Sequence, residues 1–382
     1  MEISATQTPF IAQLLDTSQI REYDHLTYIA TCNLNFGNSS VDIICYDHLE
    51  DNFSVGNTYK HVFPPVGGIH WMPKYTGQSE DKVIAIAYDD IHLFKENELI
   101  CKLAIKNTKM RHYNLPGTSK RTDNPNIIGV PAMNITGFRF NEYNPYEIVS
   151  SLYDGCCLLW DIEYNGSTVD HKTKPLEYKF NTNSNIIFDV CHLKQYKLMD
   201  VCYGHTKNTI YVAFDNGAAL SLDLRTPTKY STSIVSDCIQ GWQGGIISSE
   251  FTACKLTYIE DTCLFARALL NKGIVDIFDN RKSCGPLFSI QSNVFNHSNL
   301  KISSMDCLKV STKTLLTVAR EDGIVELFDI NENTSKLENY YKSSMTIYGF
   351  TSINHPLYKN LLGIVSVYDS INNAAYLKMI SV

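Results

Sequence analysis

Apolar residues occur along the chain in short runs separated by turn-forming residues, and no stretch sustains the 3.6-residue period of an amphipathic helix. The clearest example is EIVSSLYDGCCLLWDIE, residues 147–163, which we interpret as two strands. Asp154-Gly155 lies between them and is typical of a two-residue hairpin turn. Runs of this kind recur to the end of the chain, so the pattern predicts an all-β protein.

A repeated spacing accompanies these runs. A glycine stands six residues before an aspartate, and a large apolar residue directly precedes that aspartate. The glycines are Gly155, Gly217, Gly273 and Gly323, the apolar residues are Trp160, Leu222, Phe278 and Phe328, and the aspartates are Asp161, Asp223, Asp279 and Asp329. Glycine tolerates the positive φ of a tight turn, the apolar residue fills the space between sheets, and aspartate accepts backbone hydrogen bonds. We therefore interpret these positions as structural.

The runs group into seven units, and the last unit has only three strands before the chain reaches Val382. Trp160-Asp161 is the dipeptide associated with propeller blades. A spare strand at residues 10–15 can complete the last unit, and closing the ring removes its exposed sheet edges. We therefore expect a single domain over residues 1–382, a seven-bladed β-propeller closed by pairing of its N-terminal and C-terminal strands.

Composition and charge exclude several classes of protein. Apolar residues make up 44% of the chain and the net charge is −7, which is typical of a globular protein and argues against a surface built for nucleic-acid phosphates. We see no secretory signal and no apolar run long enough to span a membrane. The 12 cysteines show no C-x-x-C pair, so we expect reduced, buried thiols in the cytoplasm or nucleus.

Residues 105–132 interrupt the strand pattern with proline, glycine and a basic cluster, so we expect a long loop there. The basic residues are Lys106, Lys109, Arg111, Lys120 and Arg121. Three interpretations stay open: a solvated flexible loop, a docking site for an acidic or phosphorylated partner, or a nucleic-acid contact.

This loop joins the last strand of one unit to the first strand of the next. Other connectors of this kind carry Phe63, Trp242, Phe295 and His297. Trp242 is flanked by glycine and polar residues, so it is either an exposed anchor for a partner or a plug at the end of the propeller channel. The candidate partner-binding residues are Arg111, Lys120, Arg121, Trp242, Phe295 and His297.

Motifs of catalysis are missing from the sequence. We find no G-x-x-x-x-G-K-[ST], G-x-G-x-x-G or G-x-S-x-G motif. Cys191 and His192 are adjacent in sequence, but a catalytic pair must meet in space with a third orienting group. The four repeated aspartates, one per blade, would stand far apart around the ring. We expect no enzyme activity, no cofactor and no metal.

Two stretches carry a resemblance. HVFPPVGGIHWMP, residues 61–73, followed by VIAIAYDDIHLFKENE, resembles the second blade of the Transparent Testa Glabra type of WD-repeat scaffold, whose animal members are cullin-ligase-associated factors. FNEYNPYEIVSSLYDGCCLLWDIE resembles the W-N-E-x-D-P segment and the following S-S-x-D-x-x-C-x-x-W of that family. Phe140 replaces the usual tryptophan and Gly155 the usual threonine, and the later units resemble only generic WD repeats.

The resemblance implies a non-enzymatic scaffold or adaptor for protein–protein interactions. Expected partners are protein kinases, MYB or basic helix–loop–helix transcription regulators, or subunits of a cullin-type ubiquitin ligase. Two other classes stay open: a structural propeller of a large assembly such as the nuclear pore, and a WD-repeat hydrolase.

Overall fold

The structure is a computed structural model, and everything stated about it concerns the residues that it describes. These are residues 2–8, 12–18, 25–32, 39–61, 68–73, 82–87, 90–95, 98–103, 135–152, 157–162, 198–215, 217, 219–224, 254–260, 262–281, 285–291, 301–310, 313–331, 334–353 and 361–381.

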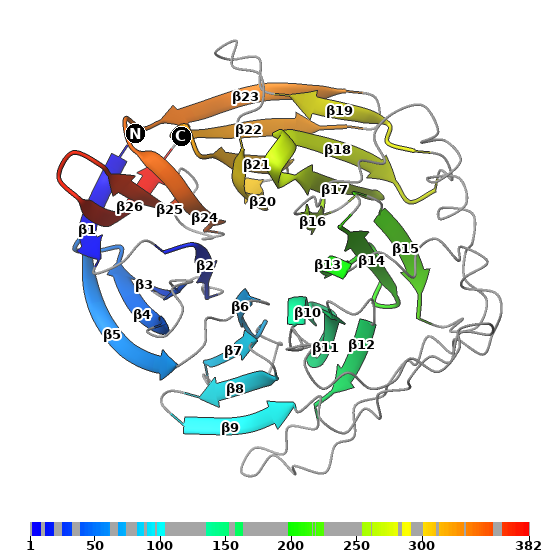
Figure 1. The fold of residues 1–382 in the computed structure, drawn as a ribbon, viewed down its shortest axis with the longest axis horizontal. Coiled ribbons are helices and arrows are strands. Elements are labelled where there is room, and N and C mark those ends of the chain that lie inside the picture. Colours follow the sequence, from blue (N-terminus) through cyan, green and yellow to red (C-terminus); the bar gives the residue numbers. More distant parts are fainter. Residues whose placement is uncertain are drawn as a thin grey trace, which may run out of the picture.

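The described strands form seven antiparallel sheets that stand around a common centre (Figure 1). We number the sheets along the chain. Sheet 1 contains β2 (Leu14–Thr17), β3 (Leu26–Cys32), β4 (Ser39–Asp47) and β5 (Asn52–His61); sheet 2 contains β6 (Gly68–Trp71), β7 (Val83–Ala87), β8 (Ile91–Lys95) and β9 (Glu98–Leu103); sheet 3 contains β10 (Ile135–Asn141), β11 (Asn144–Leu152) and β12 (Cys157–Asp161).

The chain continues around the ring in the same sense. Sheet 4 contains β13 (Leu198–Tyr203), β14 (Thr209–Phe214) and β15 (Ala219–Asp223); sheet 5 contains β16 (Cys254–Tyr258), β17 (Leu264–Leu269), β18 (Ile274–Asp279) and β19 (Phe288–Gln291), with the 3-10 turn η3 (Leu270–Lys272) between β17 and β18; sheet 6 contains β20 (Ile302–Val310), β21 (Lys313–Arg320), β22 (Ile324–Ile330) and β23 (Ser335–Lys342); sheet 7 contains β24 (Thr346–Ser352), β25 (Leu361–Asp369), β26 (Ala374–Ser381) and β1 (Glu2–Thr8).

The N-terminal strand lies in the same sheet as the C-terminal strand. β1 pairs antiparallel with β26, from Glu2 opposite Ile380 to Thr8 opposite Ala375. The sequence-based assignment of this pairing to residues 10–15 was wrong, because Leu14 and Leu15 begin β2 of sheet 1. β1 is an outermost strand with mostly polar, partly exposed side chains, so the hydrophobic pattern does not mark it.

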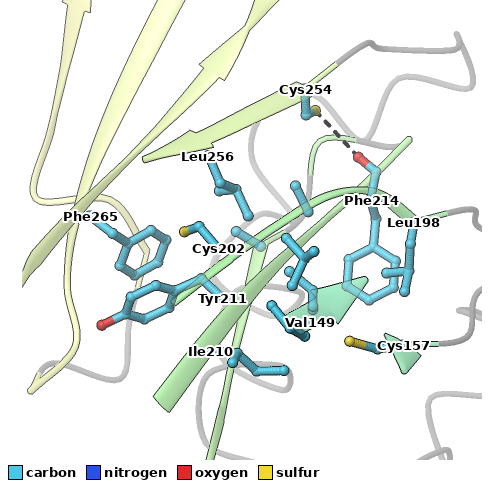
Figure 2. Close-up of a cluster of buried hydrophobic side chains, with 14 of the residues drawn as sticks. Val149, Cys157, Leu198, Cys202, Ile210, Tyr211, Phe214, Cys254, Leu256 and Phe265 are labelled. Carbon is cyan, nitrogen blue, oxygen red and sulfur yellow. Dashed lines mark hydrogen bonds between the residues drawn. The ribbon is translucent and has the colours of Figure 1, made fainter. Parts of the chain in front are cut away.

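The apolar core lies between neighbouring sheets. Figure 2 shows a cluster in which buried side chains of sheets 3, 4 and 5 meet. Tyr211 of β14 stacks on Phe265 of β17 with ring centroids 4.0 Å apart. The Cys254 thiol donates a hydrogen bond to the backbone oxygen of Phe214 at 3.4 Å. Each sheet thus buries apolar side chains on both faces, as a ring of stacked sheets requires.

The repeated glycines occupy tight turns between the second and third strands. Gly217, Gly273 and Gly323 all have positive φ, at 86°, 65° and 89°. A Cβ on Gly323 would lie 2.5 Å from the backbone oxygen of Ser343, so this turn also requires a residue without a side chain. Gly155 lies outside the described residues.

The repeated large apolar residues are buried between sheets. Trp160 packs in the layer shared by sheets 2 and 3, and Phe278 and Phe328 pack in the layers on either side of sheet 5. Leu222 lies on β15, but its side chain is outside the described ones. Among the described residues, no helix has the length and hydrophobicity that a membrane crossing requires.

Candidate functional site

The first strands of the seven sheets surround the centre of the ring (Figure 1), which we call the channel because cavities lined by these strands lie there. Two adjoining cavities of about 430 and 280 Å³ occupy it. The larger one opens where these strands end, beside Ser18, Tyr143 and Gly204, and the smaller one reaches toward their beginnings at Gln13 and Ser303. Residues that line both cavities form what we call the waist of the channel. These are Asp16, Thr17, Arg139, Phe140, Glu142, Thr257, Asp306 and Thr351.

Three aspartates on the first strands join neighbouring sheets. Asp16 Oδ2 on β2 accepts a hydrogen bond from the backbone N–H of Trp71 on β6 at 2.7 Å. Asp200 Oδ2 on β13 accepts one from Leu256 on β16 at 2.9 Å. Asp306 Oδ2 on β20 accepts the backbone N–H of Ser352 on β24 at 3.0 Å and its hydroxyl at 2.6 Å. Charge-assisted bonds of this kind are about twice as strong as neutral ones.

The basic residue Arg139 joins sheets 2, 3 and 4. Its Nη1 donates to Nε2 of His70 on β6 at 2.8 Å and to the backbone oxygen of Phe138 at 2.7 Å. Its Nη2 lies 3.7 Å from Oδ2 of Asp200 on β13. Gly137 makes this approach possible, since a Cβ there would lie 2.4 Å from Oδ1 of Asp200.

Two further contacts complete the circuit. The Cys307 thiol of β20 donates to the backbone oxygen of Tyr258 on β16 at 3.2 Å, which joins sheets 5 and 6. The Thr17 hydroxyl of β2 donates to the backbone oxygen of Ser352 on β24 at 2.8 Å, which joins sheets 7 and 1. Every pair of neighbouring sheets is therefore linked by a polar contact between first strands. We call this set of contacts the inner ring.

Acidic side chains outnumber basic ones around the larger cavity, where Asp16, Glu142, Glu260 and Asp306 line it together with Arg139. Desolvation by the channel wall, followed by the nearby carboxylates of Glu260 and Asp306, raises the pKa of Glu142 to about 7. Burial also raises the pKa of Asp306, although the hydrogen bonds from Ser352 and Cys307 oppose the shift. Lys255 on β16 lines the smaller cavity, and burial lowers the pKa of its amine, although Asp200 opposes the shift and Arg139 adds to it.

The thiols at the channel are protonated. Cys202 and Cys307 line the larger cavity. Burial raises the pKa of both thiols far above the ordinary value, and nearby carboxylates such as Asp200 and Asp306 add to the shift. A buried, protonated thiol is a poor nucleophile. Among the described residues, no three His, Cys, Asp or Glu side chains converge in a way that could hold a metal ion.

The candidate partner-binding residues chosen from the sequence all lie outside the described residues. They are Arg111, Lys120, Arg121, Trp242, Phe295 and His297. The whole loop 105–132, Phe63 and Cys191 lie outside the described residues as well. They stay predictions.

The repeated aspartates have different surroundings. Asp279 is buried and accepts three hydrogen bonds from Arg281, whereas Asp329 pairs with the exposed Lys313 at 2.9 Å. Asp223 ends β15 and Asp161 ends β12, where the side chain of Asp161 is not among those described.

Sequence reasoning missed the inner ring. A signal was present, because a charged residue interrupts the apolar run of several first strands. Asp200 stands in LMDVCY, Asp306 in SSMDCLKV and Arg139 in GFRFN. Met-Asp occurs in both of the first two segments, but Asp200 lies opposite Ala213 and Asp306 lies opposite Thr317, so the two aspartates stand two residues apart in the register of their sheets.

The radial sheets, the layers between them and the inner ring define a protein with a β-propeller fold. No protein-family model matches the chain, and no curated protein sequence matches it. Among 956 matching chains of solved structures is the β-propeller domain of Myceliophteria thermophila Cps50 (Swd1). The likeness covers 100% of this chain and 99% of that one, with a TM-score of 0.58 and 8% sequence identity. At this identity it shows the fold alone, and a fold so widely shared does not determine function.

Proposed function

We propose that this chain is a non-enzymatic WD-repeat scaffold that holds partner proteins on the loop-rich faces of a rigid ring. In this proposal residues 1–382 form one domain, each of the seven sheets is one blade, and the pairing of β1 with β26 closes the ring. The observation that carries the proposal is the inner ring. It connects the first strands of all seven sheets through Asp16, Thr17, Arg139, Asp200, Asp306 and Cys307, which favours a rigid ring.

The state of the reactive groups supports a scaffold over an enzyme. Asp16 and Asp200 accept backbone hydrogen bonds, His70 accepts the Arg139 guanidinium, and the thiols of Cys202 and Cys307 are protonated. A nucleophile needs an adjacent base or a lowered pKa, and these thiols have the opposite shift. Asp16, His70, Arg139, Asp200, Asp306 and Cys307 are thus engaged in contacts that hold neighbouring sheets together.

The WD-repeat character of the ring is supported by sheet 3. Trp160 Nε1 donates to the Ser150 hydroxyl at 2.9 Å, which joins the second and third strands of this sheet inside the core. An indole N–H buried in this way needs such a partner. The Trp-Asp dipeptide therefore occupies the position that a blade requires.

The resemblance to the Transparent Testa Glabra type is carried partly by the segment between β10 and β11. Asn141 Nδ2 donates to Glu147 Oε2 at 2.9 Å, and Asn141 Oδ1 accepts the backbone N–H of Tyr143 at 2.9 Å. The Tyr143 hydroxyl reaches the backbone oxygen of His205 in sheet 4 at 3.2 Å. These residues form a turn that contacts the next sheet. We therefore assign them a structural role in the scaffold and expect other loops to select the partner.

Within this proposal the partners are protein kinases, transcription regulators or ubiquitin-ligase subunits, met in the cytoplasm or nucleus. The basic loop is the docking element that we would test first, because Arg111, Lys120 and Arg121 give it a charge opposite to that of acidic or phosphorylated segments.

Affinity purification of the tagged full chain, followed by mass spectrometry, tests this function. The triple variant Arg111→Glu, Lys120→Glu and Arg121→Glu should lose partners that the wild type captures, with an unchanged unfolding midpoint. The matched control is Lys336→Glu with Lys342→Glu, on the exposed outer strand β23, which should keep them. A second variant with Trp242, Phe295 and His297 changed to alanine examines the other connectors.

Each other outcome changes the conclusion. Recovery of nuclear-pore proteins would assign the chain to a large structural assembly. Ester turnover by the purified chain alone would overturn the scaffold proposal. Equal capture by the triple variant and the control would remove the basic loop from the docking surface.

A further inference from the structure

His70 occupies the centre of a polar chain that crosses four sheets. Its Nδ1 lies 3.6 Å from Oδ2 of Asp16 on β2, and its Nε2 lies 2.8 Å from Nη1 of Arg139 on β10. The ring of Phe138 meets the imidazole edge-on, with centroids 4.9 Å apart. Lys255 on β16 contributes a positive charge from the facing wall. The charged groups around the imidazole are therefore Asp16, Arg139 and Lys255.

The contact with Arg139 determines the tautomer of His70. A guanidinium has donors only, so the nitrogen that faces it must be an acceptor. Nε2 of His70 therefore carries no proton, and the ring proton sits on Nδ1, facing Asp16. The imidazole is neutral in this arrangement. Burial, followed by the charge of Arg139, lowers the pKa of His70, which is the direction that this geometry requires.

Protonation of His70 breaks this contact. An Nε2–H group would point at an N–H group of Arg139, and the added positive charge would repel the guanidinium. A receiving site is present on the other side of Arg139. Asp200 Oδ2 lies 3.7 Å from Nη2, and Asp200 Oδ1 is buried without a hydrogen-bond partner among the described residues. A carboxylate can accept a guanidinium through both oxygens.

A movement of Arg139 would affect both the cavities of the channel and the contact between two sheets. Arg139 lines both cavities and so forms part of the waist of the channel. It is also the described side chain that connects the first strands of sheets 2 and 3 in the inner ring. A displaced Arg139 changes the shape of the waist and removes one of the seven inter-sheet links at the same time.

We propose that His70 and Arg139 form an acid-sensitive latch at the waist of the channel. Neutral His70 holds Arg139 against β6, and addition of a proton to Nε2 releases Arg139 toward Asp200. The latch is a conformational device of the ring and is independent of which partner proteins the faces bind.

Solution NMR of the full chain with labelled histidine and arginine side chains tests the latch. At pH 7.5 His70 should show the tautomer with the proton on Nδ1. On titration toward pH 5 it should take up a proton below the ordinary histidine pKa of 6.5, and the Arg139 side-chain signals should shift with the same midpoint. A tautomer with the proton on Nε2, or Arg139 signals that do not follow His70, would overturn the proposal.

Two glutamine variants provide matched readouts. In His70→Gln the side-chain oxygen can still accept from Arg139 but does not titrate, so the pH-dependent shift of Arg139 should be lost. His92→Gln is the control, because His92 on β8 also has a burial-lowered pKa but is not part of the contact with Arg139. Retention of the Arg139 transition in His70→Gln would contradict the latch. If that variant fails to fold, the wild-type tautomer and midpoints decide.

Discussion

Sheets 3 and 5 place an aromatic residue at the same point of the third strand but connect that strand to the second one differently. In sheet 3, Trp160 stands opposite Ile148, and the Trp160 indole donates to Ser150, two residues further along β11. In sheet 5, Phe278 stands opposite Phe265, and the residue two positions further along β17 is Arg267. A hydroxyl in one sheet and a guanidinium in the other thus occupy equivalent positions.

The residue on the third strand that bonds to this hydroxyl or guanidinium also differs between the two sheets. Arg267 pairs with Asp276, directly opposite, inside the core. Sheet 6 has Glu326 at the corresponding place, and Arg320 reaches it at 2.6 Å. Phenylalanine has no N–H to offer a neighbouring strand, whereas tryptophan does. The comparison teaches that the blade template specifies a buried polar link between these strands, and that local sequence decides whether it is a hydrogen bond or an ion pair.

Breaking the ion pair of sheet 6 should give the largest effect. Arg320→Met removes the guanidinium that pairs with the fully buried Glu326 and also removes the hydrogen bond from Nη1 to the backbone oxygen of Gly273 in sheet 5. Loss of one partner of a buried pair costs about 3–5 kcal/mol, and we expect the upper end in urea unfolding.

The matched control for this variant is the double change Arg320→Met with Glu326→Leu. It removes both charges, and apolar replacement of a buried pair is often neutral, so most of the lost stability should return. A single variant within about 1 kcal/mol of the wild type would contradict the need for a buried polar link here.

Two variants of Trp160 in sheet 3 compare the energetic contribution of its packing with that of its hydrogen bond to Ser150. Trp160→Ala should cost about 3–5 kcal/mol, because it deletes a buried aromatic side chain between sheets 2 and 3. Trp160→Phe keeps an aromatic ring but removes the bond to buried Ser150 and part of the side-chain volume, so it should cost less than the alanine variant, about 1–3 kcal/mol. Both are measured as changes in the free energy of unfolding. An alanine variant with a cost under about 1 kcal/mol would show that this tryptophan is not a core residue of a blade.

The sequence anticipates the features that repeat locally. Alternating apolar runs and the glycine-to-aspartate spacing indicate the strands and place Trp160, Phe278 and Phe328 in the core, because these signals lie within a few residues of one another. The apolar pattern does not predict β1, because an outermost strand needs few apolar side chains. The pattern also does not predict the burial of Arg267 and Arg320. Arginine is almost never fully buried unless it is paired, and the pairing is not visible in the sequence.

The inner ring could not be assembled from sequence for a different reason. Its contacts join residues far apart along the chain, such as Asp16 with Trp71 and Arg139 with His70. The charged residues within the apolar first strands were visible, but their partners are set by how neighbouring sheets pack. For Asp16 and Asp200 the partner is a backbone N–H group, which no side-chain motif reveals.

The smallest effect is expected at the repeated aspartate of sheet 6, and its comparison with the aspartate of sheet 5 tests whether the template extends to the end of the third strand. Asp279 in sheet 5 is buried and accepts hydrogen bonds from the backbone N–H, Nε and Nη2 of Arg281, so Asp279→Ala should cost about 1.5–3 kcal/mol. Asp329 in sheet 6 meets an exposed lysine, and such pairs contribute little, so Asp329→Ala should leave the urea midpoint unchanged within error. Equal losses in the two variants would mean that the aspartate has one common role in both sheets. Unequal losses would mean that the repeated letter marks a strand end whose energetic role depends on the residue that follows it.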